Sequence, residues 1–172
     1  MAETKQADVV VIGTGPGGYV AAIRLAQLGK KTIAVEREAV GGVCLNWGCI
    51  PSKAMIGAST LVETVKGASI MGIDVGDLNV DVGRMKAWKD GIVKRLTGGI
   101  GELFKRNGVE LVKGDATFES DGRITVTNSK GTVTIETRHT LVATGARPRA
   151  LPNLEIDGER IVTSKEALDF GE

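Results

Sequence analysis

A glycine-rich turn between an apolar strand and a helix is the feature that most limits how this chain can fold. The sequence GTGPGG places Gly13, Gly15 and Gly18 in the pattern G-x-G-x-x-G. The run DVVVIG before it is apolar on both faces, which is typical of a buried strand. The run YVAAIRLAQLG predicts a helix ending at Gly29, and KTIAVE predicts a second strand ending at Glu36. This order predicts a β-α-β unit.

Each of these positions has a physical role in such a unit. Gly13 permits a tight turn, Gly15 lets the backbone approach a pyrophosphate, and Gly18 lets helix and strand pack closely. The first N–H groups of the helix and its positive dipole end favour phosphate. An acidic residue that ends the second strand, here Glu36, can bind ribose hydroxyls. The unit predicts a dinucleotide site without separating FAD from NAD, and a tight turn without a ligand is the alternative.

Both cysteines, Cys44 and Cys49, lie in the stretch GGVCLNWGCIPSKA. A zinc site takes about four ligands, and the only histidine, His139, is distant in sequence, so we expect no metal site. The run IPSKAMIGASTLVETVK predicts a helix, so the cysteines lie at or just before its N-terminus, where the dipole favours a thiolate. Lys53 would lie one turn after Cys49 on a similar face. A dithiol/disulfide couple and an inert buried pair both remain open.

The composition excludes some partners. The net charge of +1 gives no electrostatic reason to expect nucleic acid or an anionic membrane as a partner. The start of the chain is polar, and the apolar run 9–12 is too short for a signal peptide or a membrane span. We therefore expect a cytoplasmic protein. In a reducing cytoplasm, a disulfide is more often catalytic than structural.

The rest of the chain supplies further elements of an α/β fold. Residues 80–110 have helical spacing with a basic outer face, and Gly98, Gly99 and Gly101 inside this segment predict close packing or a helix break. VELVKGDATF predicts a short strand followed by a loop, and GRITVTNSKGTVTIET predicts a hairpin. HTLVATGARP predicts a last parallel strand that ends near the first one. His139 is expected to be structural.

The stretch GGVCLNWGCIPSKA, with LTGGI, LVATGARPR and TSKEAL further on, resembles the pyridine nucleotide–disulfide oxidoreductases over essentially the whole chain. Within that family it is most similar to the dihydrolipoyl dehydrogenase branch, since glutathione and mercuric reductases usually carry valine at the place of Leu45. Val43 and Trp47 replace a commoner threonine and valine. The resemblance implies an α/β, Rossmann-like FAD-binding domain with a parallel sheet, flanking helices and a small antiparallel β-meander.

The resemblance also implies site residues. Cys44 would be the thiol that exchanges with the lipoyl disulfide, Cys49 the thiol next to the flavin, and Lys53 a charge near the reactive edge of the flavin ring. FAD is implied to contact Gly13, Gly15, Gly18, Glu36, Arg37, Gly41, Gly42, Val43, Cys44, Lys53, Ala116, Thr144, Gly145 and Ala146.

A full member of that family carries a second glycine fingerprint for NAD, a later glycine–aspartate motif and a C-terminal His-Glu pair, which these 172 residues do not contain. We therefore expect residues 1–150 to form the FAD-binding domain and residues 151–172 to begin the connection to an NAD-binding domain. The parent, expected to be a homodimer, would oxidise dihydrolipoyl groups on lipoyl domains of 2-oxo acid dehydrogenase complexes, whereas this portion alone would not. The alternatives are a flavin- or nucleotide-binding module without turnover and the same domain of a sibling disulfide reductase.

Overall fold

The computed structural model describes residues 3–169, which form two compact units. The first contains residues 3–44 and 96–147, and the second contains residues 45–95 and 148–169. The division at residue 150 that the sequence suggested stays a prediction.

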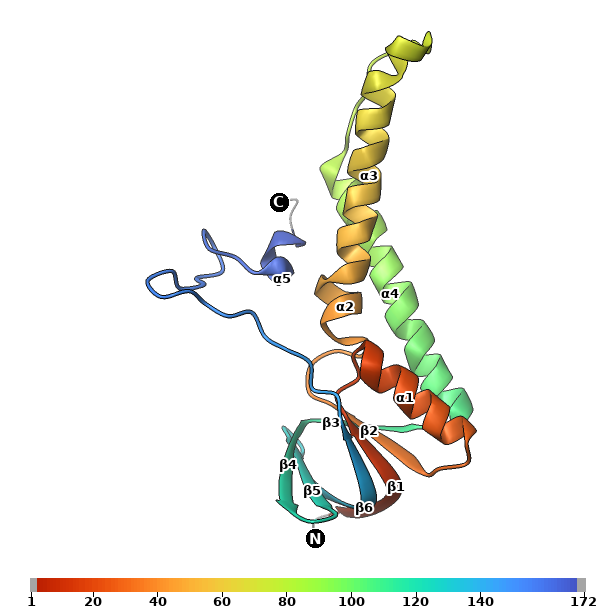
Figure 1. The fold of residues 1–172 in the computed structure, drawn as a ribbon, viewed down its shortest axis with the longest axis vertical. Helices are drawn as coiled ribbons and strands as arrows, with labels where there is room; N and C mark the ends of the chain where they lie inside the picture. The colour runs from red at the N-terminus through yellow and green to blue at the C-terminus, as the bar shows by residue number, and fades with distance from the viewer. Residues whose placement is uncertain (1–2, 170–172) are drawn as a thin grey trace. The chain divides into compact units, whose positions relative to one another are not determined.

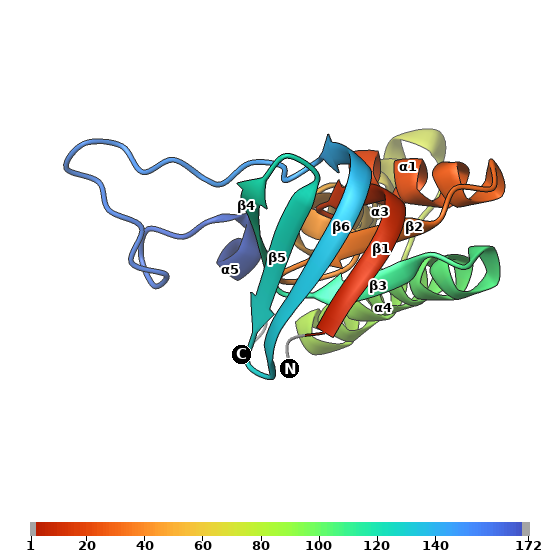
Figure 2. The same cartoon turned by 90° about the horizontal axis from the view of Figure 1, so that it is seen from below.

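The first unit is built on a sheet of six strands within residues 3–169, in the order β3-β2-β1-β6-β5-β4 (Figure 2). The strands are β1 (Glu3–Ile12), β2 (Thr32–Glu36), β3 (Glu110–Lys113), β4 (Asp115–Ser120), β5 (Arg123–Asn128) and β6 (Gly131–Val142). β1 pairs in parallel with β2 and β6, and β2 pairs in parallel with β3. β4, β5 and β6 are antiparallel neighbours. A parallel sheet with a small antiparallel meander is the fold class that the sequence predicted.

The core of this unit is formed by buried side chains of β1, β2, β3, β5 and β6. Val10 and Val11 are fully buried, and every residue of β2 is buried. Helix α1 (Pro16–Gln27) contacts both strands, as Figure 1 illustrates. It starts with proline, whose missing N–H costs nothing in the first turn, and it stops just before Gly29, whose φ is 77°. The predicted β-α-β unit is therefore confirmed.

Three strand boundaries differ from the sequence-based expectation. β1 begins five residues before the predicted strand DVVVIG, because residues 3–7 pair in register with residues 133–137 of β6. Backbone pairing needs no apolar side chains, and Lys5 instead forms ion pairs with Glu3 and Glu110. The second strand of the hairpin and the last parallel strand form one continuous strand, β6, and the first strand of the hairpin is β5. β4 follows β3 directly after Gly114, where we expected a loop, because glycine tolerates the φ of 147° found there.

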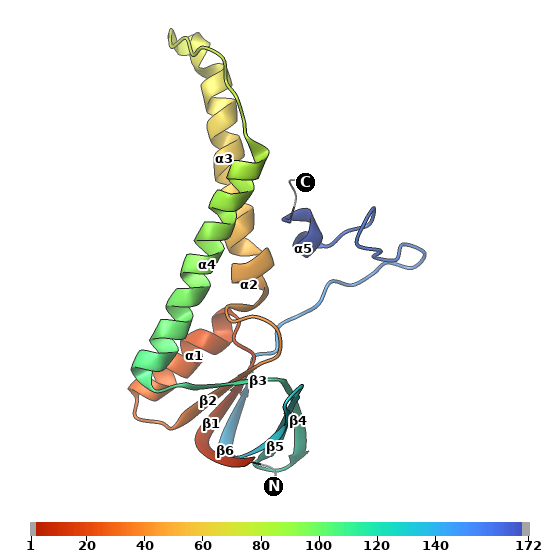
Figure 3. The same cartoon turned by 180° about the vertical axis from the view of Figure 1, so that it is seen from behind.

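The second unit is mainly helical. It contains the second half of α2 (Gly42–Trp47), then α3 (Cys49–Gly67), η1 (Ala68–Met71), the first half of α4 (Val82–Asn107) and α5 (Ser164–Ala167). In Figures 1 and 3, α3 and residues 82–95 of α4 run in opposite directions. The helix predicted after the cysteines is confirmed and begins at Cys49 itself. Among residues 3–169, no helix combines the length and the apolar character that a membrane crossing requires.

The three glycines inside α4 mark neither a break nor close packing. The helix continues through Gly98, Gly99 and Gly101 to Asn107. A Cβ on any of the three would meet no described atom within 4 Å, apart from chain neighbours and the helix's own backbone. The expectation was wrong because glycine reduces helix propensity by only about 1 kcal/mol per residue, which a helix of 26 residues can absorb.

Candidate functional site

The turn after β1 packs tightly against the turn after β6. Gly13 N donates to Val35 O at 2.8 Å, and Ala143 N donates to Ile12 O at 2.8 Å. Gly13 has a φ of 96°, and a Cβ there would lie 2.3 Å from Ala143 O. The predicted tight turn is confirmed, and glycine is required both by the positive φ and by the contact with the neighbouring turn.

The glycines after Gly13 fall into two groups. A Cβ on Gly18 would lie 1.9 Å from Gly13 O, so its absence lets α1 sit directly on the turn. Gly15, the N-cap residue of α1, has no neighbour within 4 Å of a built Cβ, and neither has Gly17. Gly15 offers no capping side chain, and the first turn of α1 carries no acidic residue. An open backbone at a positive helix end is the chemistry that suits a phosphate group.

Glu36, at the end of β2, is buried with 8% of its surface exposed. Its Oε2 accepts hydrogen bonds from Thr14 N at 2.9 Å and Thr14 Oγ1 at 2.7 Å, and its Oε1 accepts from Glu38 N at 2.8 Å. Burial opposes ionisation, but these three hydrogen bonds and the charge of Lys113 together hold the pKa of Glu36 below its ordinary value. The carboxylate therefore stays charged near neutral pH.

The hydrogen bonds leave limited room for a ligand at Glu36. A carboxylate has about four acceptor positions, and Thr14 fills both on Oε2 while Glu38 fills one on Oε1. One position on Oε1 is left by these bonds and could accept a hydroxyl. Thr14, which is fully buried, was missed from the sequence, although its place between Gly13 and Gly15 could have pointed to it.

The chain after β2 returns to the glycine turn. Gly41 N donates to Thr14 O at 2.9 Å. A Cβ on Gly42, whose φ is 59°, would lie 2.7 Å from Gly15 Cα. The structure therefore brings the predicted residues Gly41 and Gly42 to the fingerprint. Arg37 and Val43, also predicted, are exposed on either side of this return.

The remaining cofactor candidates come from β4 and from the end of β6. Thr144 lies two residues after β6, and its Cα lies 3.2 Å from the position of a Cβ built on Gly13. Gly145 has a φ of 71°, and both it and Ala146 are exposed. Ala116 is partly buried in β4 and packs against the sheet core. It lies two residues after Gly114, whose N donates to Glu36 O at 3.0 Å. The roles of these residues in cofactor binding stay predictions.

Cys44 and Cys49 are joined by a disulfide, which confirms the expected pairing. Cys44 is the third residue of α2 and is half-buried, whereas Cys49 is the first residue of α3 and is exposed. The N-terminus of a helix of 19 residues favours a thiolate at Cys49. Lys53 is exposed four residues later, on the same side of α3. Within residues 3–169 no group of three or more ligand-type side chains could hold a metal ion.

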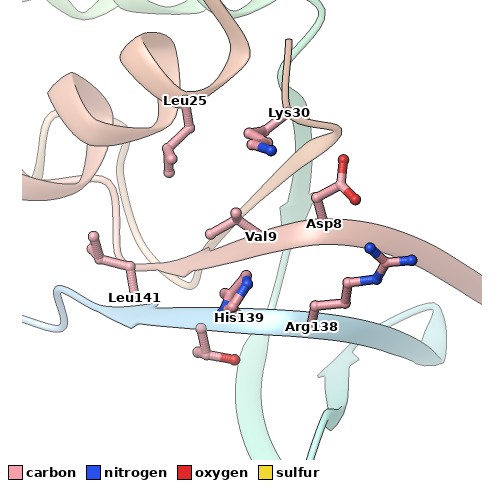
Figure 4. Close-up of a pocket in the computed structure, with 8 residues that line it drawn as sticks. Asp8, Val9, Leu25, Lys30, Arg138, His139 and Leu141 are labelled. Carbon is pink, nitrogen blue, oxygen red and sulfur yellow. The ribbon is translucent and has the colours of Figure 1, made fainter. Parts of the chain in front are cut away.

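A cavity of about 380 Å³ lies elsewhere in the first unit, between the C-terminal part of α1 and the strands β1 and β6. Figure 4 displays Leu25 on α1 above Val9 on β1, with His139 on β6. The cavity contains none of the predicted site residues. It is lined by Asp8, Val9, Leu25, Lys30, Arg138, His139, Thr140 and Leu141.

Residues 7–172 match the family described as pyridine nucleotide-disulphide oxidoreductase. The chain is 51% identical over 168 residues to dihydrolipoyl dehydrogenase 2 of Haloarcula marismortui, covering 96% of this chain and 35% of the relative. It is 46% identical over 167 residues to dihydrolipoyl dehydrogenase of Geobacillus stearothermophilus, covering 97% and 35%. The crystal structure of LpdA from Mycobacterium tuberculosis matches with a TM-score of 0.82 at 28% identity, covering 96% of this chain and 37% of that one. The chain thus spans about a third of the length of these relatives.

Proposed function

Since the chain belongs to the pyridine nucleotide–disulphide oxidoreductase family, we propose that it is the FAD-binding, disulfide-bearing part of a dihydrolipoyl dehydrogenase. One observation carries the proposal: the disulfide of Cys44 and Cys49 lies at the N-terminus of α3. The helix dipole there stabilises the thiolate that leaves when the disulfide is opened. The names of relatives at 46–51% identity point to the lipoamide branch.

The residues of the first unit fit FAD. The open backbone at Gly15 and the free end of α1 would receive the pyrophosphate, and the remaining acceptor position on Glu36 would bind one ribose hydroxyl. Gly41, Gly42 and Thr144 lie against the same turn and would line the site. Arg37, Val43, Ala116, Gly145 and Ala146 complete the proposed set. When bound, FAD would accept an electron pair from the reduced cysteines and deliver it to NAD.

The cysteines would carry out the exchange with substrate. One thiolate of a dihydrolipoyl group attacks Cys44 Sγ, the Cys44–Cys49 bond breaks, and Cys49 leaves as a thiolate. The second thiol of the substrate gives its proton to solvent and attacks the substrate sulfur of the mixed disulfide, and Cys44 leaves as a thiolate. The substrate ends as a cyclic disulfide, and the cysteine pair holds the two electrons. The positive charge of Lys53, on the same helix as Cys49, would favour the thiolate form.

The parent enzyme that we propose would act on lipoyl domains of 2-oxo acid dehydrogenase complexes, with NAD as acceptor, as a homodimer in the cytoplasm.

The test combines flavin binding with thiol counting. The chain is titrated with FAD and then treated, in the absence of oxygen, with at least two equivalents of dihydrolipoamide, one electron pair for the flavin and one for the disulfide. Free thiols are counted by alkylation and mass measurement. The expected result is a shifted flavin absorbance on binding, two new thiols per chain, and loss of the oxidised flavin band. Cys49→Ser should bind FAD but keep that band. Flavin binding without reduction of the cysteines would favour a binding module, and faster reduction by glutathione than by dihydrolipoamide would favour a sibling reductase.

A further inference from the structure

The C-terminal segment of the second unit is fixed to α4. We refer to residues 163–169 as the clamp segment. Its first residue, Thr163, forms a capping box with Glu166 at the start of α5. At its other end, Lys89 Nζ donates to Leu168 O at 2.5 Å, and Lys86 forms an ion pair with Asp169 at 2.8 Å. The clamp segment is therefore anchored on both sides of its short helix.

The clamp segment holds the loop between the two cysteines through Trp47. Ser164 Oγ donates to Trp47 O at 2.8 Å. Lys165 Nζ lies 4.6 Å from the centroid of the Trp47 ring, within the range of a cation–π interaction. Trp47 is the last residue of α2 and belongs to the short loop, from Cys44 to Cys49, that the disulfide closes. Both the backbone and the side chain of Trp47 are thus in contact with the clamp segment, which is not part of that loop.

We propose that Ser164 and Lys165 are positioning residues that favour the disulfide over the dithiol form of the cysteine pair. This inference rests on the proposed redox function of the pair. The disulfide fixes the loop between Cys44 and Cys49, so Trp47 contacts Ser164 and Lys165 without further loss of conformational freedom. After reduction the loop between the cysteines is no longer closed by a covalent bond, and the same two contacts form only if this more flexible loop is ordered. A contact that is stronger in one of two states shifts the equilibrium towards that state by the difference.

The equilibrium between the disulfide and the dithiol form of the cysteine pair is measured with dithiothreitol as the redox partner. In this reaction the Cys44–Cys49 bond breaks, one S–S bond forms within dithiothreitol, and its two thiol protons end on Cys44 and Cys49. The full chain is equilibrated in mixtures of reduced and oxidised dithiothreitol, and the protein dithiol is trapped by alkylation and quantified by mass. The readout is the equilibrium constant for reduction, which a purely structural role of the clamp segment would leave unchanged.

Two variants remove one contact each. Ser164→Ala removes the hydrogen bond to Trp47 O, and Lys165→Gln removes the cation over the ring. From the usual strength of such contacts, each should raise the equilibrium constant for reduction about two- to fivefold. Ser164→Thr and Lys165→Arg keep the donor and the cation, and they should restore the wild-type value.

Matched controls come from the same unit. Ser69→Ala and Lys66→Gln change exposed residues of the same types in η1 and α3, and they should leave the equilibrium unchanged. Thermal unfolding checks that each variant folds, and because each variant removes one named contact, either variant can decide the question alone. An unchanged or lowered constant in a folded variant overturns the inference. If the wild-type disulfide cannot be reduced in the folded chain, the proposed redox function itself fails.

Discussion

Glu36 illustrates what a single residue contributes to the candidate site. Its position at the end of β2 follows from the sequence, but its hydrogen bonds do not. Thr14 N, Thr14 Oγ1 and Glu38 N all donate to its carboxylate, which keeps it ionised although it is buried. The same bonds reduce the acceptor positions open to a ribose to one. Glu36 is therefore both a part of the fold and a proposed cofactor ligand.

Replacing Glu36 with Gln should weaken FAD binding about tenfold or more, because a hydrogen bond to a charged group contributes about 1.5–3 kcal/mol. The measurement is a fluorescence titration of the apo chain with FAD. Glu102→Gln, an exposed change on α4, serves as the control. An unchanged dissociation constant in the folded Glu36→Gln variant would remove Glu36 from the site.

Thr14→Val should make the stability of the chain lower at neutral pH and less dependent on pH in the acid range. The pKa of Glu36 lies below its ordinary value of 4.5, so Glu36 stabilises the fold fully above that pH and loses this effect as the pH falls through its folded pKa. Valine keeps the shape of Thr14 but removes the hydroxyl donor, so this pKa should rise. We expect a loss of about 1.5–3 kcal/mol at pH 7, shrinking at low pH, by urea unfolding at several pH values. Thr14→Ser should retain most of the effect, and a loss independent of pH would contradict this account.

At the scale of elements, two neighbouring glycines at the start of α1 differ in their contacts with the turn after β1. Gly18→Ala should destabilise the chain by at least about 2 kcal/mol, because the new Cβ would lie 1.9 Å from Gly13 O. Gly17→Ala, one residue earlier in the same helix, meets nothing within 4 Å and should be neutral or stabilising by up to about 1 kcal/mol. Urea unfolding of both variants without FAD measures the difference. Equal effects would show that packing of the helix on the turn does not explain Gly18.

The elements that were predicted correctly are those whose sequence pattern and tertiary environment agree. The apolar runs of β1 and β2, the fingerprint between them and Gly29 all indicate one β-α-β unit, and the structure contains it. The helix after Cys49 was predicted correctly because proline favours the first turn, whereas the short helix α2 that contains Cys44 was not predicted. In each case a local signal determines the local structure, and the surrounding sheet only reinforces it.

The elements that were missed depend on partners distant in sequence. The polar residues 3–7 become strand only because β6 lies beside them, and no periodicity records this. The contacts of Thr14 with Glu36 and of Ser164 with Trp47 join residues 22 and 117 positions apart. Ala116 has no feature of its own that suggests a ligand. Such contacts are products of the assembled sheet and helices, so a sequence pattern cannot supply them.

At the scale of the whole molecule, the chain combines a nucleotide-type glycine turn with a cysteine pair, over about a third of the length of its relatives. The sequence contains a single G-x-G-x-x-G pattern, which the adjoining Cys-x4-Cys stretch assigns to FAD in our proposal. The oxidation of a dithiol by NAD requires three parts: an exchanging cysteine pair, a flavin, and a nicotinamide held close to the flavin. The 172 residues supply the first and, in our proposal, a site for the second.

We therefore expect that the 172-residue chain, loaded with FAD, does not form NADH from dihydrolipoamide and NAD at an ordinary enzymatic rate. Without a site that orients the nicotinamide, the reaction loses an effective molarity that reaches about 10⁵ M or more in well-oriented systems. Without the general base that the family resemblance places in a C-terminal segment, it loses a further factor of about 10²–10⁴. Reduction of the cysteine pair by dihydrolipoamide should still proceed, because this exchange needs no nicotinamide. The assay follows NADH absorbance, with thiol counting on the same sample and Cys49→Ser as control. Turnover of about 1 s⁻¹ or faster, abolished in Cys49→Ser, would mean that residues of this chain also bind and orient NAD.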